Sequence, residues 1–204
     1  MDTKEKHKVL NVIILDESGS MVSIKEPIIT AFNELIQNIK EEVKKYPDQE
    51  HSVTFVSFNG NGIKTHFENV PISSLDKINS KKYNPNNNTP LYDAMGFTLT
   101  KLEKITDTLK NYNVIVTIFT DGYENASTEY NSNSIIELVN KLKDKNWIFN
   151  YVGTEHDVEK AASEMGISNF YQVSKDSNGI LDAKKFMLCQ YQINMCKISQ
   201  DSKK

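Results

Sequence analysis

The chain contains few cysteines and no long run of apolar residues. Its two thiols, Cys189 and Cys196, fall on one predicted helix, where a rise of ~1.5 Å per residue separates them by about 10 Å, too far for a disulfide. No segment approaches the ~20 apolar residues of a transmembrane helix, and the polar N-terminus lacks the apolar core of a signal peptide. These absences predict a cytoplasmic location, reduced and buried thiols, and no membrane partner.

A large excess of charge of one sign is also missing. The formal net charge is −3 and the pI is about 5.8, so electrostatics give no reason to expect nucleic acid as a partner. Apolar residues make up 38% of the chain and charged residues 25%, a balance typical of soluble globular proteins. We expect a single domain over residues 1–204, with a core at about 8–175 and a C-terminal helix at about 180–199.

Several motifs of common catalytic and cofactor sites are absent. The first predicted turn contains Gly19 but neither G-x-G-x-x-G nor the P-loop sequence, which argues against a nucleotide-binding site. Ser18 lacks the G-x-S-x-G context of a serine hydrolase, and no histidine can be placed beside it. The four histidines lie in different predicted elements without ligand spacing, so they do not predict a zinc site. They are His7, His51, His66 and His156.

The chain does contain a regular alternation of strand and helix patterns. Strand-type composition predicts strands at 9–15, 52–58, 63–70, 114–120, 147–152 and 169–173. Helical patterns predict helices at 24–46, 90–109, 134–145, 155–165 and 181–198. The Asn-Gly-Asn-Gly sequence at 59–62 predicts a hairpin, so that 63–70 returns antiparallel. The predicted fold class is α/β: a doubly wound, Rossmann-like, mostly parallel sheet with one antiparallel edge strand and helices on both faces.

Local features refine this assignment. Thr89 and Pro90 have the residue types of a helix N-cap and first position, and 134–137 fits a capping box. Trp147 begins a strand and is expected in the core. The Asn-rich segment 79–88 has no periodicity and predicts a long polar loop. The last helix has one candidate buried stripe, formed by Phe186, Cys189, Ile193 and Cys196.

Oxygen-bearing side chains follow two of the predicted strands. Asp16, Ser18 and Ser20 come directly after the strand 9–15, and Asp121 follows the strand 114–120. Thr89 precedes a helix. Carboxylates and hydroxyls are the hard donors that suit Mg²⁺, Ca²⁺ or Mn²⁺. Because these two strands are neighbours in the common doubly wound order, Asp16 and Asp121 should face one another at the carboxyl edge of the sheet. The sequence therefore predicts a divalent cation site built from three loops.

Three motifs in this order resemble the metal-ion-dependent adhesion site of von Willebrand factor A domains. They are 16–20 (DESGS), 88–94 (NTPLYDA) and 119–122 (FTDG), and the resemblance extends from about 9 to 173. It implies that Mg²⁺, with Mn²⁺ or Ca²⁺ possible, is held by the hydroxyls of Ser18, Ser20 and Thr89, and by Asp16 and Asp121 directly or through water. It also implies that a Glu or Asp of a protein partner completes the ion's coordination.

Two functions compete on this basis. The favoured one is a non-enzymatic module that docks an acidic residue of a protein partner through a bridging Mg²⁺. Its predicted contact surface is the 79–88 loop with Tyr92, Tyr123 and Glu124, while Glu17, Glu124 and Asn125 are expected to be solvated rim residues outside the ligand set. The alternative is a Mg²⁺-dependent phosphohydrolase of haloacid-dehalogenase type. That chemistry needs a carboxylate where this chain has Ser18, and a phosphate-binding lysine that the sequence does not place.

Overall fold

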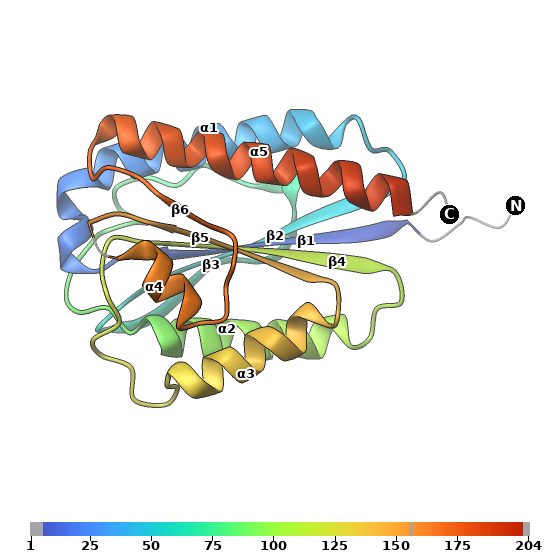
Figure 1. Cartoon of the computed structure of the whole chain (residues 1–204). Coiled ribbons are helices and arrows are strands. Elements are labelled where there is room, and N and C mark those ends of the chain that lie inside the picture. The colour runs from blue at the N-terminus through green and yellow to red at the C-terminus, as the bar shows by residue number, and fades with distance from the viewer. Residues whose placement is uncertain (1–5, 156, 202–204) are drawn as a thin grey trace, which may run out of the picture.

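The first strand of the chain lies inside a sheet that helices cover on both faces. In the computed structural model, which describes residues 6–155 and 157–201, six strands form one sheet in the order β3-β2-β1-β4-β5-β6 (Figure 1). Neighbouring strands are parallel except β2 and β3, which form the predicted antiparallel hairpin at one edge. The predicted fold class is confirmed. The strands are β1 (His7–Asp16), β2 (Gln49–Asn59), β3 (Gly62–Pro71), β4 (Tyr112–Thr120), β5 (Trp147–Gly153) and β6 (Phe170–Gln172).

The helices form two layers, one on each face of the sheet. Figure 1 shows α1 and α5 side by side on one face, and α2, α3 and α4 on the other. Side chains of β1 alternate between these faces, so that Ile13 joins the core under α1 and α5 while Ile14 joins the core over α2 and α3. The helices are α1 (Lys25–Val43), α2 (Leu91–Thr106), α3 (Ser132–Lys143), α4 (Val158–Ser163) and α5 (Ser177–Asp201), with short 3₁₀ turns η1 (Gly19–Ile24) and η2 (Ile72–Ser74).

Two helix starts differ from the prediction. Pro90, not Thr89, occupies the N-cap position of α2, and no side chain caps this helix. The capping box of α3 exists three residues earlier than predicted. Asn131 is its N-cap and accepts a 3.0 Å hydrogen bond from the amide of Ser134, whose hydroxyl accepts one from the amide of Asn131. Ser134 is therefore the third helical residue and not the N-cap. Asparagine is as favourable at the N-cap position as serine, so Asn131 can begin the helix earlier.

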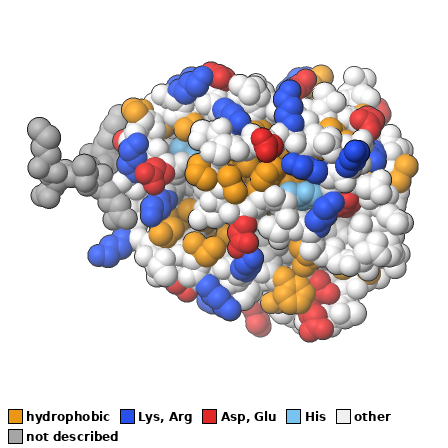
Figure 2. All heavy atoms as spheres, turned by 180° about the vertical axis from the view of Figure 1, so that it is seen from behind, with side chains coloured by type: hydrophobic (Ala, Val, Ile, Leu, Met, Phe, Trp, Pro, Cys, Tyr) orange, Lys and Arg blue, Asp and Glu red, His pale blue; other side chains and the backbone are white. Residues whose placement is uncertain are grey.

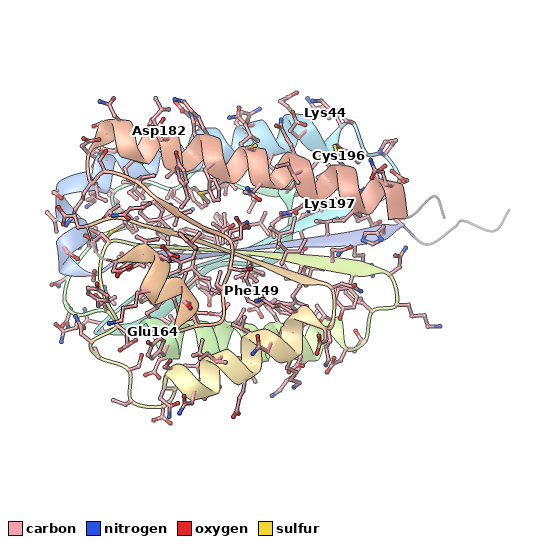
Figure 3. All side chains as sticks on the ribbon, in the orientation of Figure 1. Lys44, Phe149, Glu164, Asp182, Cys196 and Lys197 are labelled. Carbon is pink, nitrogen blue, oxygen red and sulfur yellow. The ribbon has the colours of Figure 1, made fainter. Side chains whose placement is uncertain are left out.

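The predicted buried stripe of α5 is wrong. Cys189 and Cys196 are exposed free thiols and Ile193 is 41% exposed, and Cys196 is labelled on α5 in Figure 3. Phe186 is partly buried and stacks on Tyr171. A different stripe of α5 packs on the sheet; it consists of Ile180, Ala183, Tyr191, Met195 and Ile198. Because this stripe and the predicted one both have helical spacing, periodicity alone could not distinguish them.

Two further features concern the surface and the core. Trp147 is 3% exposed, which confirms its prediction as a core residue. None of the helices in the described residues combines the length and hydropathy required to cross a membrane. On the face seen in Figure 2, lysine and acidic side chains are interspersed around hydrophobic side chains that gather near the middle. That face therefore has no continuous basic surface.

Candidate functional site

The carboxyl ends of β1 and β4 bring two buried aspartates together. Leu15 pairs with Phe119 in the sheet register, so Asp16 and Asp121 follow neighbouring strands onto the same edge. Their residues are 0% and 4% exposed. Because parallel strands end at one rim, residues 105 positions apart in sequence reach a single site.

Asp16 uses both carboxylate oxygens in hydrogen bonds. Its Oδ1 accepts the amide N–H of Ser18 at 2.7 Å, and its Oδ2 accepts the hydroxyl of Thr120 at 2.6 Å. Burial raises the pKa of Asp16 to about 6, although these hydrogen bonds oppose the rise and the charge of Asp121 adds to it. Asp16 is thus a fixed, buried acceptor that orders the loop after β1.

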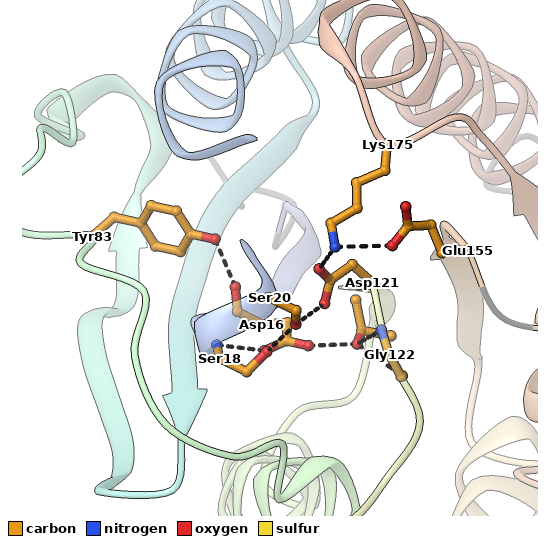
Figure 4. Close-up of polar contacts among 9 residues, drawn as sticks. Asp16, Ser18, Ser20, Tyr83, Asp121, Gly122, Glu155 and Lys175 are labelled. Carbon is orange, nitrogen blue, oxygen red and sulfur yellow. Dashed lines mark hydrogen bonds and ion pairs between the residues drawn. The ribbon is translucent and has the colours of Figure 1, made fainter. Parts of the chain in front are cut away.

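Two serine hydroxyls connect the first loop to Asp121. The Oγ atom of Ser20 donates to Oδ1 of Asp121 at 2.6 Å, and lies 3.1 Å from Oγ of Ser18 (Figure 4). Oδ2 of Asp121 is buried and is bonded to neither serine hydroxyl; its contact is an ion pair with Lys175, 2.9 Å away. The result is a compact group of oxygens at the end of β1 and β4.

Thr89 precedes α2 and is held by the loop that follows β4. It is 4% exposed, and its amide N–H donates to Oδ1 of Asn125 at 2.9 Å. Its carbonyl accepts the amide of Asn125 at 3.2 Å. Among the described contacts, no hydrogen bond joins the Thr89 hydroxyl to Asp16, Ser18, Ser20 or Asp121. Asn125 is exposed, as predicted for a rim residue, and it also fixes the main chain that carries Thr89.

Glu17 was also predicted to be solvated, and this is wrong. It is 4% exposed, and its carboxylate accepts hydrogen bonds from the hydroxyl of Ser57 and the amide of Asn84. Its carbonyl accepts the amide of Asn86 at 2.8 Å. Glu17 therefore holds the Asn-rich loop against the end of β1. The reason lies in tertiary structure: β2 and the Asn-rich loop cover a side chain that its local sequence predicts to be exposed.

The Asn-rich loop is ordered by these contacts but keeps an exposed polar surface. The amide of Gly19 donates to the carbonyl of Asn87 at 2.8 Å, while the residues Asn86, Asn87 and Asn88 remain exposed. Asn87 has a φ of 67°, a left-handed conformation that asparagine tolerates better than most residues. The predicted long loop is confirmed.

The loop after β4 is held by two acidic side chains. Glu124 accepts hydrogen bonds from the amides of Tyr92, Ala126 and Ser127 and from the Ser127 hydroxyl, at 2.6–2.8 Å. Asp93 accepts the amides of Thr128, Glu129 and Tyr130 at 2.8–3.0 Å. Both oxygens of Glu124 are therefore occupied in holding this loop, and its place on a partner-contact surface stays a prediction. Tyr123 is 51% exposed on the same loop.

A lysine that the sequence patterns did not indicate also lies at this site. Lys175, in the turn between β6 and α5, places its Nζ atom 2.9 Å from Oδ2 of Asp121 and 3.0 Å from Oε2 of Glu155 (Figure 4). Burial alone lowers the pKa of Lys175, but its contacts with Asp121 and Glu155 outweigh burial and raise it. The available signal was its position just after the last parallel strand, whose carboxyl end lies on the same rim.

These residues fit a hard cation better than a soft one. The donors are two carboxylates and neutral hydroxyls, and the described residues contain no cluster of three or more His, Cys, Asp or Glu with metal-binding geometry. His7, His51 and His66 lie on different strands, and His156 lies outside the described residues. An all-oxygen set with few charges is the kind that Mg²⁺ or Mn²⁺ prefers over the nitrogen and sulfur ligands of zinc.

Comparisons with known proteins agree with this fold. No curated protein sequence matches the chain. Among solved structures, the vWF domain of the type V pili tip protein Mfa5 from Porphyromonas gingivalis has a TM-score of 0.66 and 10% identity, covering 93% of this chain and 96% of that one. The SpRpn10 VWA domain has a TM-score of 0.58 and 10% identity, covering 85% and 92%.

A further match is with a longer protein. Proximal thread matrix protein 1 from the mussel byssus has a TM-score of 0.59 and 11% identity, and the match covers 90% of this chain but only 46% of the mussel chain. At such low identities these likenesses establish the fold alone. The family model of the von Willebrand factor type A domain matches residues 12–183, so the chain belongs to the von Willebrand factor type A domain family.

Proposed function

We propose that this domain is a protein-binding module that docks an acidic side chain of its partner through a divalent cation. The proposed ligands are Asp16, Ser18, Ser20, Thr89 and Asp121, and Mg²⁺ is the preferred ion, with Mn²⁺ or Ca²⁺ as substitutes. The observation that carries the proposal is the hydrogen-bonded group of Ser18, Ser20 and Asp121 at the sheet's carboxyl edge. Family membership supports a role in protein interaction.

The chemistry of the ligands explains why a partner carboxylate is favoured. Hydroxyl oxygens carry no formal charge, so a bound ion in this set keeps part of its positive charge and attracts an external carboxylate. Asp16 has both oxygens engaged by Ser18 and Thr120, which suits a role in positioning the serines. The exposed Asn86–Asn88 segment and Tyr123 provide amide and aromatic surface around the docking point.

A phosphohydrolase of haloacid-dehalogenase type has less support. Lys175 supplies a cation near Asp121, but the position two residues after Asp16 is Ser18, and Asp16 is wholly buried with both carboxylate oxygens hydrogen-bonded. A carboxylate in that state is poorly placed to attack a phosphate. We expect no Mg²⁺-dependent turnover of p-nitrophenyl phosphate. Turnover that the Asp16→Asn variant loses would revive this function.

The proposal is tested by comparing metal binding, docking and folding in one protein. Mn²⁺ titration by calorimetry should detect binding in the wild type and strongly weakened binding in Asp121→Ala. The control is Asp107→Ala, which removes an exposed aspartate paired with Lys145 far from the rim. Peptide libraries with a central Glu should bind in Mg²⁺ and not in EDTA, while libraries with Gln should bind in neither.

Folding must be measured on the same samples. We expect the melting transition to persist in EDTA, because cores on both faces of the sheet support the fold. Peptide binding that survives EDTA in the folded protein would contradict a metal bridge. Absence of Mn²⁺ binding would contradict the site itself.

A further inference from the structure

Lys175 is held in place on both sides of its main chain. The preceding strand is anchored where the amide of Val173 donates to the carbonyl of Gly153 at 3.0 Å. On the other side, Asp176 accepts the amide of Gly179 at 2.8 Å at the start of α5. A turn fixed in this way directs the lysine side chain toward the rim, where Figure 4 shows its ammonium between Asp121 and Glu155.

The ammonium contacts an oxygen of the proposed metal site. It lies 2.9 Å from Oδ2 of Asp121, whose other oxygen accepts the Ser20 hydroxyl. The Asp121 side chain is 0% exposed and that of Lys175 is 14% exposed. The ion pair is therefore shielded from water, and Coulomb forces within it are stronger than at the surface. Lys175 thus already supplies a positive charge at the position where the proposed divalent cation would bind.

We propose that Lys175 is a tethered cation that competes with the divalent ion for Asp121, an inference that rests on the proposed function of this rim. The Lys175 ammonium and the divalent ion repel each other when both contact one buried carboxylate. Each therefore weakens the binding of the other to Asp121. Without a divalent ion, the ammonium neutralises Asp121 and keeps the rim folded. When the ion is bound, the ammonium loses part of its interaction with Asp121 and keeps Glu155 as a partner on the outer side.

This arrangement has a consequence for docking. Lys175 makes the empty rim less negative, which lowers the affinity of the site for the ion. It also makes the loaded rim more positive, which favours a carboxylate from a partner. A neutral residue at position 175 should therefore tighten the binding of the ion and weaken the docking of a carboxylate.

The first test measures Mn²⁺ affinity at pH 7.5 by calorimetry in wild type, Lys175→Met and Lys184→Met. Lys184 is the matched control because its side chain is 15% exposed and pairs with Glu34, between α5 and α1 and away from the rim. We expect Lys175→Met to bind Mn²⁺ about tenfold to a hundredfold more tightly than the wild type. Lys184→Met should bind with unchanged affinity.

Melting temperatures give a second readout from the same proteins. In EDTA, Lys175→Met should melt well below the wild type, because Asp121 is left as a buried charge without a cation. Saturating Mg²⁺ should raise the melting temperature of Lys175→Met by more than that of the wild type. Lys184→Met should show the same Mg²⁺ response as the wild type.

A third test uses the wild type alone and does not depend on the variant folding. Lysine acetylation by acetic anhydride is followed by mass spectrometry in EDTA and in saturating Mg²⁺. Competition predicts that Mg²⁺ increases acetylation of Lys175 severalfold and leaves Lys184 unchanged. Equal acetylation of Lys175 in both conditions, in a wild type that calorimetry shows to bind the ion, would overturn the proposal.

The outcomes separate this inference from the proposed function. Equal Mn²⁺ affinity in wild type and Lys175→Met overturns the tethered cation and leaves metal-dependent docking standing. Binding in Lys175→Met but none in the wild type supports the tethered cation and overturns metal-dependent docking in the natural chain. Binding in neither protein overturns both.

Discussion

The buried hydroxyl of Tyr83 donates a 2.8 Å hydrogen bond to the main-chain carbonyl of Asp16, although the two residues lie 67 positions apart. Tyr83 is 0% exposed and belongs to the Asn-rich loop. Burial, together with the charges of Asp16, Glu17 and Asp121, raises the pKa of Tyr83 well above its usual value. The hydroxyl therefore remains protonated, and it connects the loop directly to the strand end that carries the candidate site.

Removing this hydroxyl should destabilise the protein without changing its fold. Tyr83→Phe leaves the Asp16 carbonyl without its partner, which we expect to cost about 1–3 kcal/mol of unfolding free energy. Urea denaturation followed by circular dichroism measures this loss. Tyr171→Phe is the control, since Tyr171 is 39% exposed and interacts through its ring with Phe186. A Tyr83→Phe variant as stable as Tyr171→Phe would contradict this role of the hydrogen bond.

Glu17 should behave as a buried structural carboxylate. In Glu17→Gln an amide NH₂ group must face either the Ser57 hydroxyl or the Asn84 amide, both of which donate in the structure. We expect a loss of about 1–3 kcal/mol and faster hydrogen exchange in the Asn-rich loop.

The matched control for this change is Glu137→Gln. Glu137 is exposed on α3, so its substitution should alter the unfolding free energy by less than about 0.5 kcal/mol. Equal effects of the two substitutions would place Glu17 among the solvated residues, as its sequence context suggested.

The parts of the fold that sequence predicted are those with strong local patterns. The apolar run of β1 indicated a strand buried on both faces, and the Asn-Gly turn indicated the β2–β3 hairpin. Topology rules then predicted that Asp16 lies beside Asp121. Such rules depend only on the order of the strands and require no knowledge of side-chain contacts.

The missed features depend on contacts between distant segments. Lys175 meets Asp121 across 54 positions in sequence, and no local pattern identifies such a pair. Glu17 is buried by Ser57 and by the Asn-rich loop, which the local charge pattern does not reveal. On α5, two apolar stripes have the same spacing, and the sheet selects the one that contains Tyr191.

A glycine on α2 should be required by the loop after β4. A Cβ atom built on Gly96 would lie 2.3–2.4 Å from three ring atoms of Tyr130, and Tyr130 belongs to the segment that Asp93 holds. Gly96→Ala should therefore displace Tyr130 and reduce the unfolding free energy by about 1–3 kcal/mol, despite the better helix propensity of alanine.

The comparison for this change is Gly122→Ala. A Cβ on Gly122 would meet no atom within 4 Å and its φ is not positive, so the thermal stability should stay close to that of the wild type. Near-ultraviolet circular dichroism, which sums over all tyrosines and the single tryptophan, should change in Gly96→Ala and stay unchanged in Gly122→Ala. A Gly96→Ala protein that is more stable than the wild type would show that the loop relaxes without cost.

The last prediction concerns acid sensitivity far from the metal rim. His51 on β2 lies between the hydroxyl of Tyr191, 2.8 Å from Nδ1, and the side-chain oxygen of Gln49, 3.0 Å from Nε2. Burial lowers the pKa of His51 to about 4, and the charge of His7 adds to the effect. The unfolded chain, with an ordinary histidine pKa of about 6.5, therefore binds a proton at pH values where the folded protein does not.

This difference should make the unfolding free energy fall as the pH decreases. The contribution of neutral His51 is fully present above about pH 6.5 and is lost progressively toward pH 4, with a loss of about 2 kcal/mol between pH 7 and pH 5. His51→Gln should remove that part of the pH dependence, as measured by urea denaturation across this range. Tyr191→Phe should lower stability at every pH but keep the slope, because the imidazole remains. A His51→Gln variant with the slope of the wild type would mean that other groups cause the acid sensitivity, since only the histidine at position 51 differs between the two proteins.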